Sequence, residues 1–238
     1  MSPGPTRRAI PTGYLVYHII LTGLSPLLMS NGEVDRESDL YIAYETLAAT
    51  RKKTREQRAQ LRELEWNTRL YYDKEIGPYI PGKNIKELIR SAATKTRDGE
   101  NVRRGLVVPD YRLPLIYDGP READELWKAG FRYTTMVANA GAGSGRVDRT
   151  RPCFDQWSLE FDVAFDQEEL DAKRFEDVVN RTEKFGLGDY RPEFGAFEAS
   201  FDFVRIESAD LRVSGVKARD KKAEKANAVR AERVMSVT

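Results

Sequence analysis

Residues 77–90 read GPYIPGKNIKELIR, in which a short apolar stretch, a Pro-Gly turn and an amphipathic segment follow one another. The apolar residues after the turn recur at helical spacing and form one stripe: Ile85, Leu88, Ile89, Ala92 and Ala93. The order is that of a strand joined directly to a helix. Such a turn either only connects the two elements or also offers backbone amides to a phosphate.

Three further stretches have the pattern of strands. Residues 14–21 are apolar on both alternating faces, which is typical of a central strand covered on both sides. Residues 157–165 and 197–203 alternate apolar and polar positions. Residues 65–73 alternate in the same way and are predicted to form a half-buried strand.

Helices are predicted on both sides of these strands. Residues 40–48 follow helical spacing, and a second helix is expected to start at Thr54 with Gln57 completing a capping box. Asp166 together with Glu169 predicts the start of a later helix.

The remaining segments read as short strands and loops. Residues 102–117 are predicted to form short strands broken by prolines, and 139–150 and 186–195 are glycine-rich loops. Two βαβ-like halves with antiparallel neighbours result. The predicted fold class is α+β, with a ferredoxin-like antiparallel sheet, helices on one face and an inserted glycine-rich loop or thumb.

This pattern divides the chain into three parts. Residues 1–11 are expected to be a disordered N-terminus, and 12–207 a core domain with a loop insertion at about 136–151. Residues 208–238 form a basic C-terminal tail, since 210–238 hold eight Lys and Arg against four Asp and Glu.

Composition excludes several classes of function. The 238 residues carry a formal net charge of +1, so any basic surface must be local. The single cysteine, Cys153, excludes an internal disulfide and fits a reducing, cytoplasmic location. The sequence contains no run of about 18 apolar residues, so no membrane-spanning helix is predicted. His18 is the one histidine and reads as a structural residue of the first strand, so neither a zinc site nor any cofactor is expected.

Two aspartates after the first strand are the best candidates for catalysis. Asp35 and Asp39 lie in a loop and could hold a metal or act as acids. The alternative is that Asp35 or Ser38 caps the following helix and that an acidic residue favours its first turn. The sequence favours capping.

Basic residues give a stronger signal, because they recur near loops and near aromatic residues. The candidate contacts with nucleic acid are Lys52, Lys53, Arg55, Lys83, Lys86, Arg90, Arg146, Arg149 and Arg151. Cations that hold phosphates beside rings that stack on bases are typical of proteins that bind single strands. Any one of these clusters alone is more often a solvated surface.

Three segments resemble the RAMP superfamily, to which the backbone subunits of class 1 CRISPR effector complexes belong. Residues 79–90 resemble its Tyr-Ile-Pro-Gly-Ser-Ser-Leu-Lys-Gly-x-hydrophobic-Arg pattern, with Lys83-Asn84 in place of Ser-Ser and Glu87 in place of glycine. Residues 186–195, GLGDYRPEFG, resemble its C-terminal glycine-rich loop, and residues 15–31 its first strand.

The resemblance implies a RAMP-like or RRM-like core that binds a nucleic-acid strand. Lys83, Lys86 and Arg90 would then lie near phosphates. Arg191 joins the candidates because the loop has no other evident need for it. The implied function is a non-enzymatic protein that binds single-stranded RNA or DNA and forms a homo-oligomer along the strand. A magnesium-dependent endoribonuclease using Asp35 or Asp39 is one alternative.

A further resemblance extends to stand-alone phage or mobile-element proteins. Residues 26–31 resemble their Pro-Leu-Leu-Met-Xaa-Asn start, and residues 186–197 their glycine-rich finish. A second alternative is a structural or interaction protein, for instance a phage or defence protein whose target is another protein, which the basic tail and the balanced core permit. If the protein binds a single strand, its expected partners are nucleic acid and a second copy of the chain, and no membrane.

Overall fold

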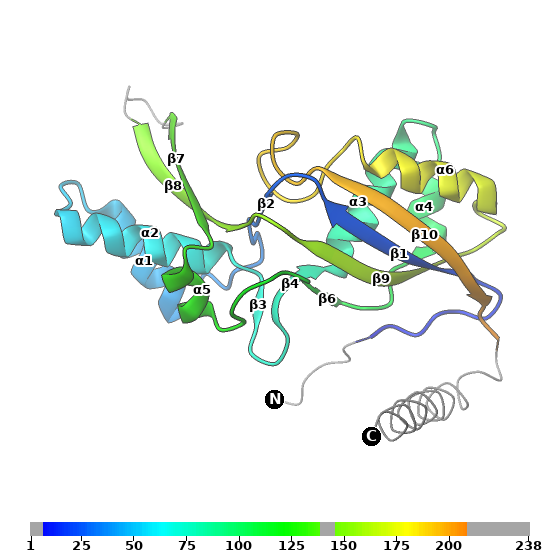
Figure 1. Ribbon diagram of the computed structural model, residues 1–238, viewed down its shortest axis with the longest axis horizontal. Helices are drawn as coiled ribbons and strands as arrows, with labels where there is room; N and C mark the ends of the chain where they lie inside the picture. Colours follow the sequence, from blue (N-terminus) through cyan, green and yellow to red (C-terminus); the bar gives the residue numbers. More distant parts are fainter. Residues whose placement is uncertain (1–6, 139–145, 209–238) are drawn as a thin grey trace, which may run out of the picture.

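The computed structural model describes residues 7–138 and 146–208 (Figure 1). Its centre is a four-stranded antiparallel sheet with the spatial order β10-β1-β9-β5. The strands are β10 (Phe197–Ile206), β1 (Leu15–Gly23), β9 (Ser158–Phe165) and β5 (Leu106–Val107). β1 is paired on both sides, which confirms its central position, and the two alternating strands are confirmed as β9 and β10. The prediction that both faces of β1 are covered holds only in part, because Val16 is buried beside Ile10 whereas Thr22 on the same face is exposed.

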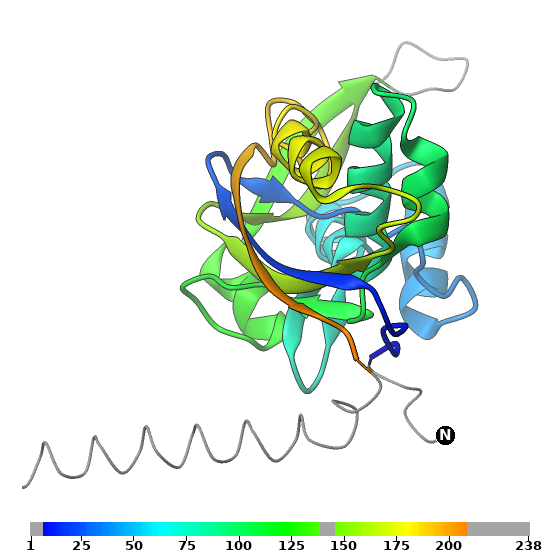
Figure 2. The same cartoon turned by 90° about the vertical axis from the view of Figure 1, so that its right-hand side faces the viewer.

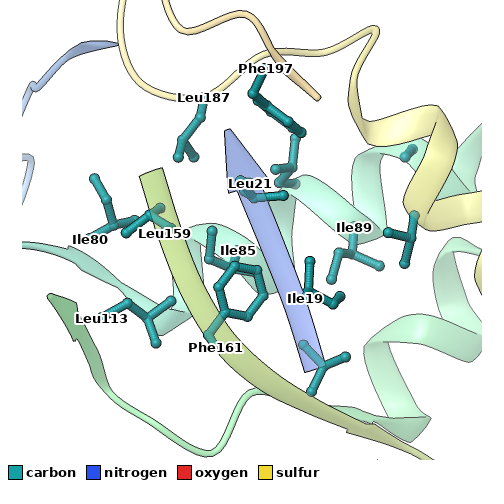
Figure 3. Packing of buried hydrophobic residues seen from close by; sticks show 14 of the residues in the cluster. Ile19, Leu21, Ile80, Ile85, Ile89, Leu113, Leu159, Phe161, Leu187 and Phe197 are labelled. Atoms are coloured by element: carbon teal, nitrogen blue, oxygen red, sulfur yellow. The ribbon is translucent and has the colours of Figure 1, made fainter. Parts of the chain in front are cut away.

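Three helices cover one face of this sheet: α3 (Gly82–Thr94), α4 (Gly99–Gly105) and α6 (Ala172–Thr182) (Figures 1 and 2). Figure 3 shows Ile19 and Leu21 of β1 in the same cluster as Ile85 and Ile89 of α3. Each of these side chains is at most 2% exposed. Burial of one such side chain contributes about 1.5–3 kcal/mol, so the apolar stripe of α3 fixes the helix on the sheet.

Three helices and two paired strands form an arm at the other end of the molecule (Figure 1). The arm contains α1 (Asp39–Ala49), α2 (Arg55–Arg69), α5 (Ala123–Ala129) and the paired strands β7 (Arg132–Ala138) and β8 (Arg146–Phe154). Trp66 of α2 is fully buried, and its indole N–H donates to the backbone oxygen of Phe131 at 2.8 Å. This contact fastens α2 to the base of the β7–β8 pair.

Short strands connect the arm to the central sheet. β2 (Leu27–Leu28) pairs with β8, and β4 (Gly77–Pro81) lies between β3 (Tyr72–Asp73) and β6 (Arg112–Pro114). β4 passes directly into α3, as the sequence 77–90 predicts.

The helix starts of the arm follow the sequence closely. The capping box at the start of α2 is confirmed, since Gln57 N–H donates to Thr54 Oγ1 at 3.2 Å and Thr54 N–H to Gln57 Oε1 at 2.9 Å. The helix predicted over residues 40–48 is α1, and no residue of it is buried.

The prediction of a strand over residues 65–73 is wrong. Residues 65–69 are the last turns of α2, and only Tyr72 and Asp73 are in a strand. A helix end that packs against β8 buries Trp66 and Thr68, which are two positions apart, and so mimics the alternation of a strand.

Two other expectations need correction. Residues 99–105 form α4, so residues 102–117 contain only the short strands β5 and β6. The later helix, α6, has Asp171 as its N-cap, which accepts from Arg174 N–H at 3.0 Å. Asp166 instead stabilises the turn before it, by accepting from Glu168 N–H at 3.0 Å.

Some predictions fall on residues outside the described ranges. These are the first six residues, the tip 139–145 of the glycine-rich loop and the tail 209–238. Within the described ranges, no helix has the length and hydrophobicity that crossing a membrane requires.

Candidate nucleic-acid interface

A groove of about 360 Å³ lies where the three segments that resemble the RAMP superfamily meet. One wall is the end of β2 with the segment after it, the second is α3 from Asn84 to Ser91, and the third is the glycine-rich loop between α6 and β10. The polar side chains that line it are Ser30, Asn84, Glu87, Ser91, Asp189 and Arg191. Residues as far apart in the sequence as Ser30 and Arg191 thus share one surface.

The glycine-rich loop is fastened to the segment containing β2 by backbone hydrogen bonds. Asp189 N–H donates to Leu28 O at 2.9 Å, and Gly195 N–H donates to Pro26 O at 2.8 Å. Leu187 enters the core beside Leu21 and Phe197 (Figure 3). The loop is therefore an ordered wall of the groove.

Glycine is required at two positions of this loop. Gly188 and Gly195 have φ angles of +86° and +71°, in the region that side chains rarely adopt. An added Cβ would also overlap the backbone oxygen of Leu28 at Gly188, and that of Leu187 at Gly195.

The Pro-Gly turn before α3 serves the packing of the fold. Gly82 N–H donates to Tyr111 O at 3.0 Å, and a Cβ at Gly82 would overlap the backbone oxygen of Asp110. Pro81 is the N-cap of α3 and makes no side-chain capping bond. The turn brings Asn84 to the groove. Gly82 is needed there because a larger residue would collide with the backbone at Asp110.

The three basic residues of α3 have different surroundings. Lys83 forms an ion pair with Glu33, and Arg90 forms one with Glu87. Lys86 donates to Leu106 O at 2.7 Å, and its partial burial lowers the pKa of its ammonium group. Lys86 thus joins α3 to β5, on a different side of the helix from the groove residues Asn84 and Glu87.

The arginines of β8 take part in a network around a buried carboxylate. Glu65 of α2, with a side chain 3% exposed, accepts from Arg151 Nη1 at 3.1 Å and from Thr150 N–H at 3.0 Å. Arg149 Nη1 lies 3.3 Å from the same carboxylate. Arg146 is exposed at the start of β8.

Arg151 joins this network to the groove. Its Nε donates to Asp189 at 3.1 Å, and only 10% of its side chain is exposed. Burial disfavours the charged guanidinium, but the bonds to Asp189 and Glu65 outweigh burial and raise the pKa of Arg151 above its usual value. One arginine therefore links the arm to the glycine-rich loop.

The basic residues between α1 and α2 lie at the outer end of the arm, away from α3 (Figure 1). Lys53 donates to Ala48 O at 2.8 Å and to Thr50 O at 2.6 Å, so it caps the end of α1. Lys52 and Arg55 are exposed. This group is separate from the groove.

Arg191 differs from the other predicted cations in lining the groove. It is exposed and has no ion pair or side-chain hydrogen bond within the described part of the chain, which is also true of Lys52, Arg55 and Arg146 outside the groove. On the same loop, Phe194 packs on Tyr133 of β7 with ring centroids 4.9 Å apart. Sequence reasoning did not find Tyr133, because only the pairing of β7 with β8 shows where this residue lies.

The acidic candidates occupy structural positions at the start of α1. Ser38 is the N-cap of α1 and accepts from Tyr41 N–H at 3.3 Å, while Asp39 lies in the first helical turn. Asp35 accepts from Glu37 N–H at 2.9 Å. Over residues 7–138 and 146–208, no group of three or more His, Cys, Asp or Glu side chains is placed to hold a metal.

The single histidine and the single cysteine of the sequence also have partners close to them. His18 Nδ1 lies 3.0 Å from an Asp162 carboxylate oxygen, as expected of a hydrogen-bonded structural histidine. Burial, with a smaller effect of Asp155, raises the pKa of the Cys153 thiol to about 12, so this thiol is protonated at neutral pH.

Comparisons with known proteins bear on the fold. No family model matches the sequence, and no curated protein is significantly similar to it. One solved structure that the chain resembles is the cryo-EM structure of the type III-B Cmr-β bound to cognate target RNA, with a TM-score of 0.51 and 12% identity. The match covers 82% of this chain and 62% of that chain. At this identity the likeness concerns the fold alone, which is mixed α and β with antiparallel sheets.

Proposed function

We propose that this protein binds single-stranded RNA or DNA along the groove between the segment after β2, α3 and the glycine-rich loop. The observation that carries the proposal is the convergence of three distant segments on one groove, lined by both polar and apolar side chains, that contains an unpaired arginine. The likeness to a Cmr structure that was solved with target RNA supports a nucleic-acid partner.

The charges of the groove suit a phosphate backbone. Its two carboxylates are compensated, because Glu87 pairs with Arg90 and Asp189 pairs with Arg151. Arg191 is left to meet a phosphate, and Ser30 and Asn84 can donate hydrogen bonds to sugars and phosphates. Since these contacts do not read base edges, sequence preference should be low and affinity should fall steeply with salt.

The proposal includes a ferredoxin-like core. The strand order β10-β1-β9-β5 supports it, with α3 in the connection between β1 and β5, and α6 in the connection between β9 and β10. It also includes head-to-tail assembly along the strand and a stand-alone phage or mobile-element origin, both of which rest on sequence resemblance.

Arg191→Ala is expected to weaken binding of a labelled single strand about tenfold at low salt and to reduce the slope of log affinity against log salt by about one, since one phosphate contact is lost. The measurement is fluorescence anisotropy over a salt series. Lys173→Ala is the matched control, because Lys173 is an exposed cation on α6 that does not line the groove. Equal effects of the two variants would contradict the assignment of Arg191.

The same material separates the proposal from its two alternatives. Affinity that rises with oligonucleotide length, together with a shift to larger particles on a sizing column, supports assembly along the strand. RNA cleavage that needs magnesium and is lost in Asp35→Ala or Asp39→Ala would identify a nuclease. Absence of binding at low salt would direct attention to a protein partner.

A further inference from the structure

The face of the central sheet opposite α3, α4 and α6 is here called the outer face (Figure 2). Ile10 covers its end at Val16 and Ala164, and the rest of the face is more open and carries acidic side chains. β1 turns Tyr17, Ile19 and Leu21 into the core, so His18, Ile20 and Thr22 lie on the outer face. The strand register places four carboxylates beside them: Glu160, Asp162, Glu198 and Asp202.

Three of these carboxylates are unpaired within the described part of the chain. Glu160, Glu198 and Asp202 are exposed and have no ion pair there. The fourth, Asp162, already binds a cation from a terminal segment, since Arg7 Nη2 lies 3.1 Å from it. Arg205, opposite Val16, also lies on this face and pairs with Glu207. The three unpaired carboxylates can therefore accept further basic side chains.

The chain itself supplies a complementary segment. Residues 210–238 hold eight Lys and Arg against four Asp and Glu, whereas the whole chain holds 39 Lys and Arg against 38 Asp and Glu. The rest of the chain therefore holds 31 basic and 34 acidic residues and is net acidic. The tail starts at the end of this sheet, where Gly13 N–H donates to Glu207 O and Glu207 N–H donates to Tyr14 O, both at 2.8 Å. Thirty residues can extend roughly 100 Å, whereas the nine-residue β1 spans about 30 Å.

We propose that residues 209–238 of this chain dock on the outer face, with their Lys and Arg side chains paired to Glu160, Glu198 and Asp202. The attachment of the tail at the edge of the face raises its local concentration there, so weak individual ion pairs add up. The docked state is sensitive to salt, because these pairs are exposed to solvent. The proposal is independent of the groove.

Limited trypsin digestion of the full chain tests the proposal, because trypsin cuts after Lys and Arg and intact mass identifies each site. Cleavage between residues 212 and 233 is expected to be slow at about 0.05 M salt and about fivefold faster at 0.5 M, since protection follows the undocked population. The variant Glu160→Gln/Glu198→Gln/Asp202→Asn is expected to show the fast rate at both salt concentrations.

The control variant is Glu37→Gln/Glu168→Gln/Asp177→Asn, which removes the same charge from exposed positions outside the outer face and should retain slow cleavage. Equal tail cleavage in the wild type and the outer-face variant would overturn the proposal. Two other results would also overturn it: protection that appears only when RNA is added, and protection that rises with protein concentration. The first would assign the tail to nucleic acid, and the second to another copy of the chain.

Discussion

Gly195→Ala and Gly188→Ala are expected to cause the largest loss of stability among single substitutions near the groove. Both glycines have positive φ, which costs an alanine about 1–2 kcal/mol. In both, the new Cβ would overlap a backbone oxygen, so the loop must also shift away from β2 or from itself. We expect a loss of at least about 3 kcal/mol in the free energy of unfolding, measured by urea titration.

Two other glycines provide matched controls. Gly130 has a φ of +90° and open space around its Cβ position, so Gly130→Ala measures the backbone cost alone. Gly32 has neither a positive φ nor a neighbour within 4 Å, and Gly32→Ala should change stability by less than about 0.5 kcal/mol. A loss of stability in Gly195→Ala no larger than that in Gly130→Ala would contradict the steric role of Gly195 in the loop.

Arg151→Met is expected to destabilise the protein by about 3–5 kcal/mol, because it leaves a buried carboxylate without its closest cation. Glu65 is 3% exposed on its side chain, and Arg149 reaches it only at 3.3 Å from a more exposed position. The substitution also releases Asp189, so binding of a single strand should weaken in the fraction that remains folded. Urea unfolding and anisotropy measure the two effects separately.

The pairing itself can be measured with a double-mutant cycle. Glu65→Gln keeps a group that can accept from Thr150 N–H and removes the charge. The variant Glu65→Gln/Arg151→Met is expected to lose less stability than the two single variants together, by about 1–3 kcal/mol. Additive losses would show that Arg151 acts by filling space, without coupling to Glu65.

Local patterns predicted much of the fold. The central position of β1, the strands β9 and β10, the capping box at Thr54 and the junction of β4 with α3 depend on neighbouring residues, and the structure confirms each of them. The end of α2 has the alternating apolar pattern of a strand. This pattern arises from burial against β8, which is a tertiary contact that the spacing of apolar residues in the sequence does not reveal.

Contacts between distant residues limited what could be predicted of the candidate site. The sequence marked Arg151, Lys86 and Arg191 equally as cations, yet the first two lie against Glu65 and Leu106 while the third faces the groove. Which cation is free depends on partners 20 or more residues away. No spacing rule supplies that information, whereas the glycines that shape the loop were visible as residue types.

The most direct test of the central claim compares two variants with the same change in net charge. Asn84→Asp/Arg191→Glu places negative charge in the groove, and Lys173→Glu/Asn180→Asp places it on α6. Binding of a labelled single strand of about 30 nucleotides is measured by anisotropy at low and high salt. We predict salt-sensitive binding by the wild type and the α6 variant and loss of binding in the groove variant. Failure of the wild type to bind, or equal binding by both variants, would contradict the proposed interface.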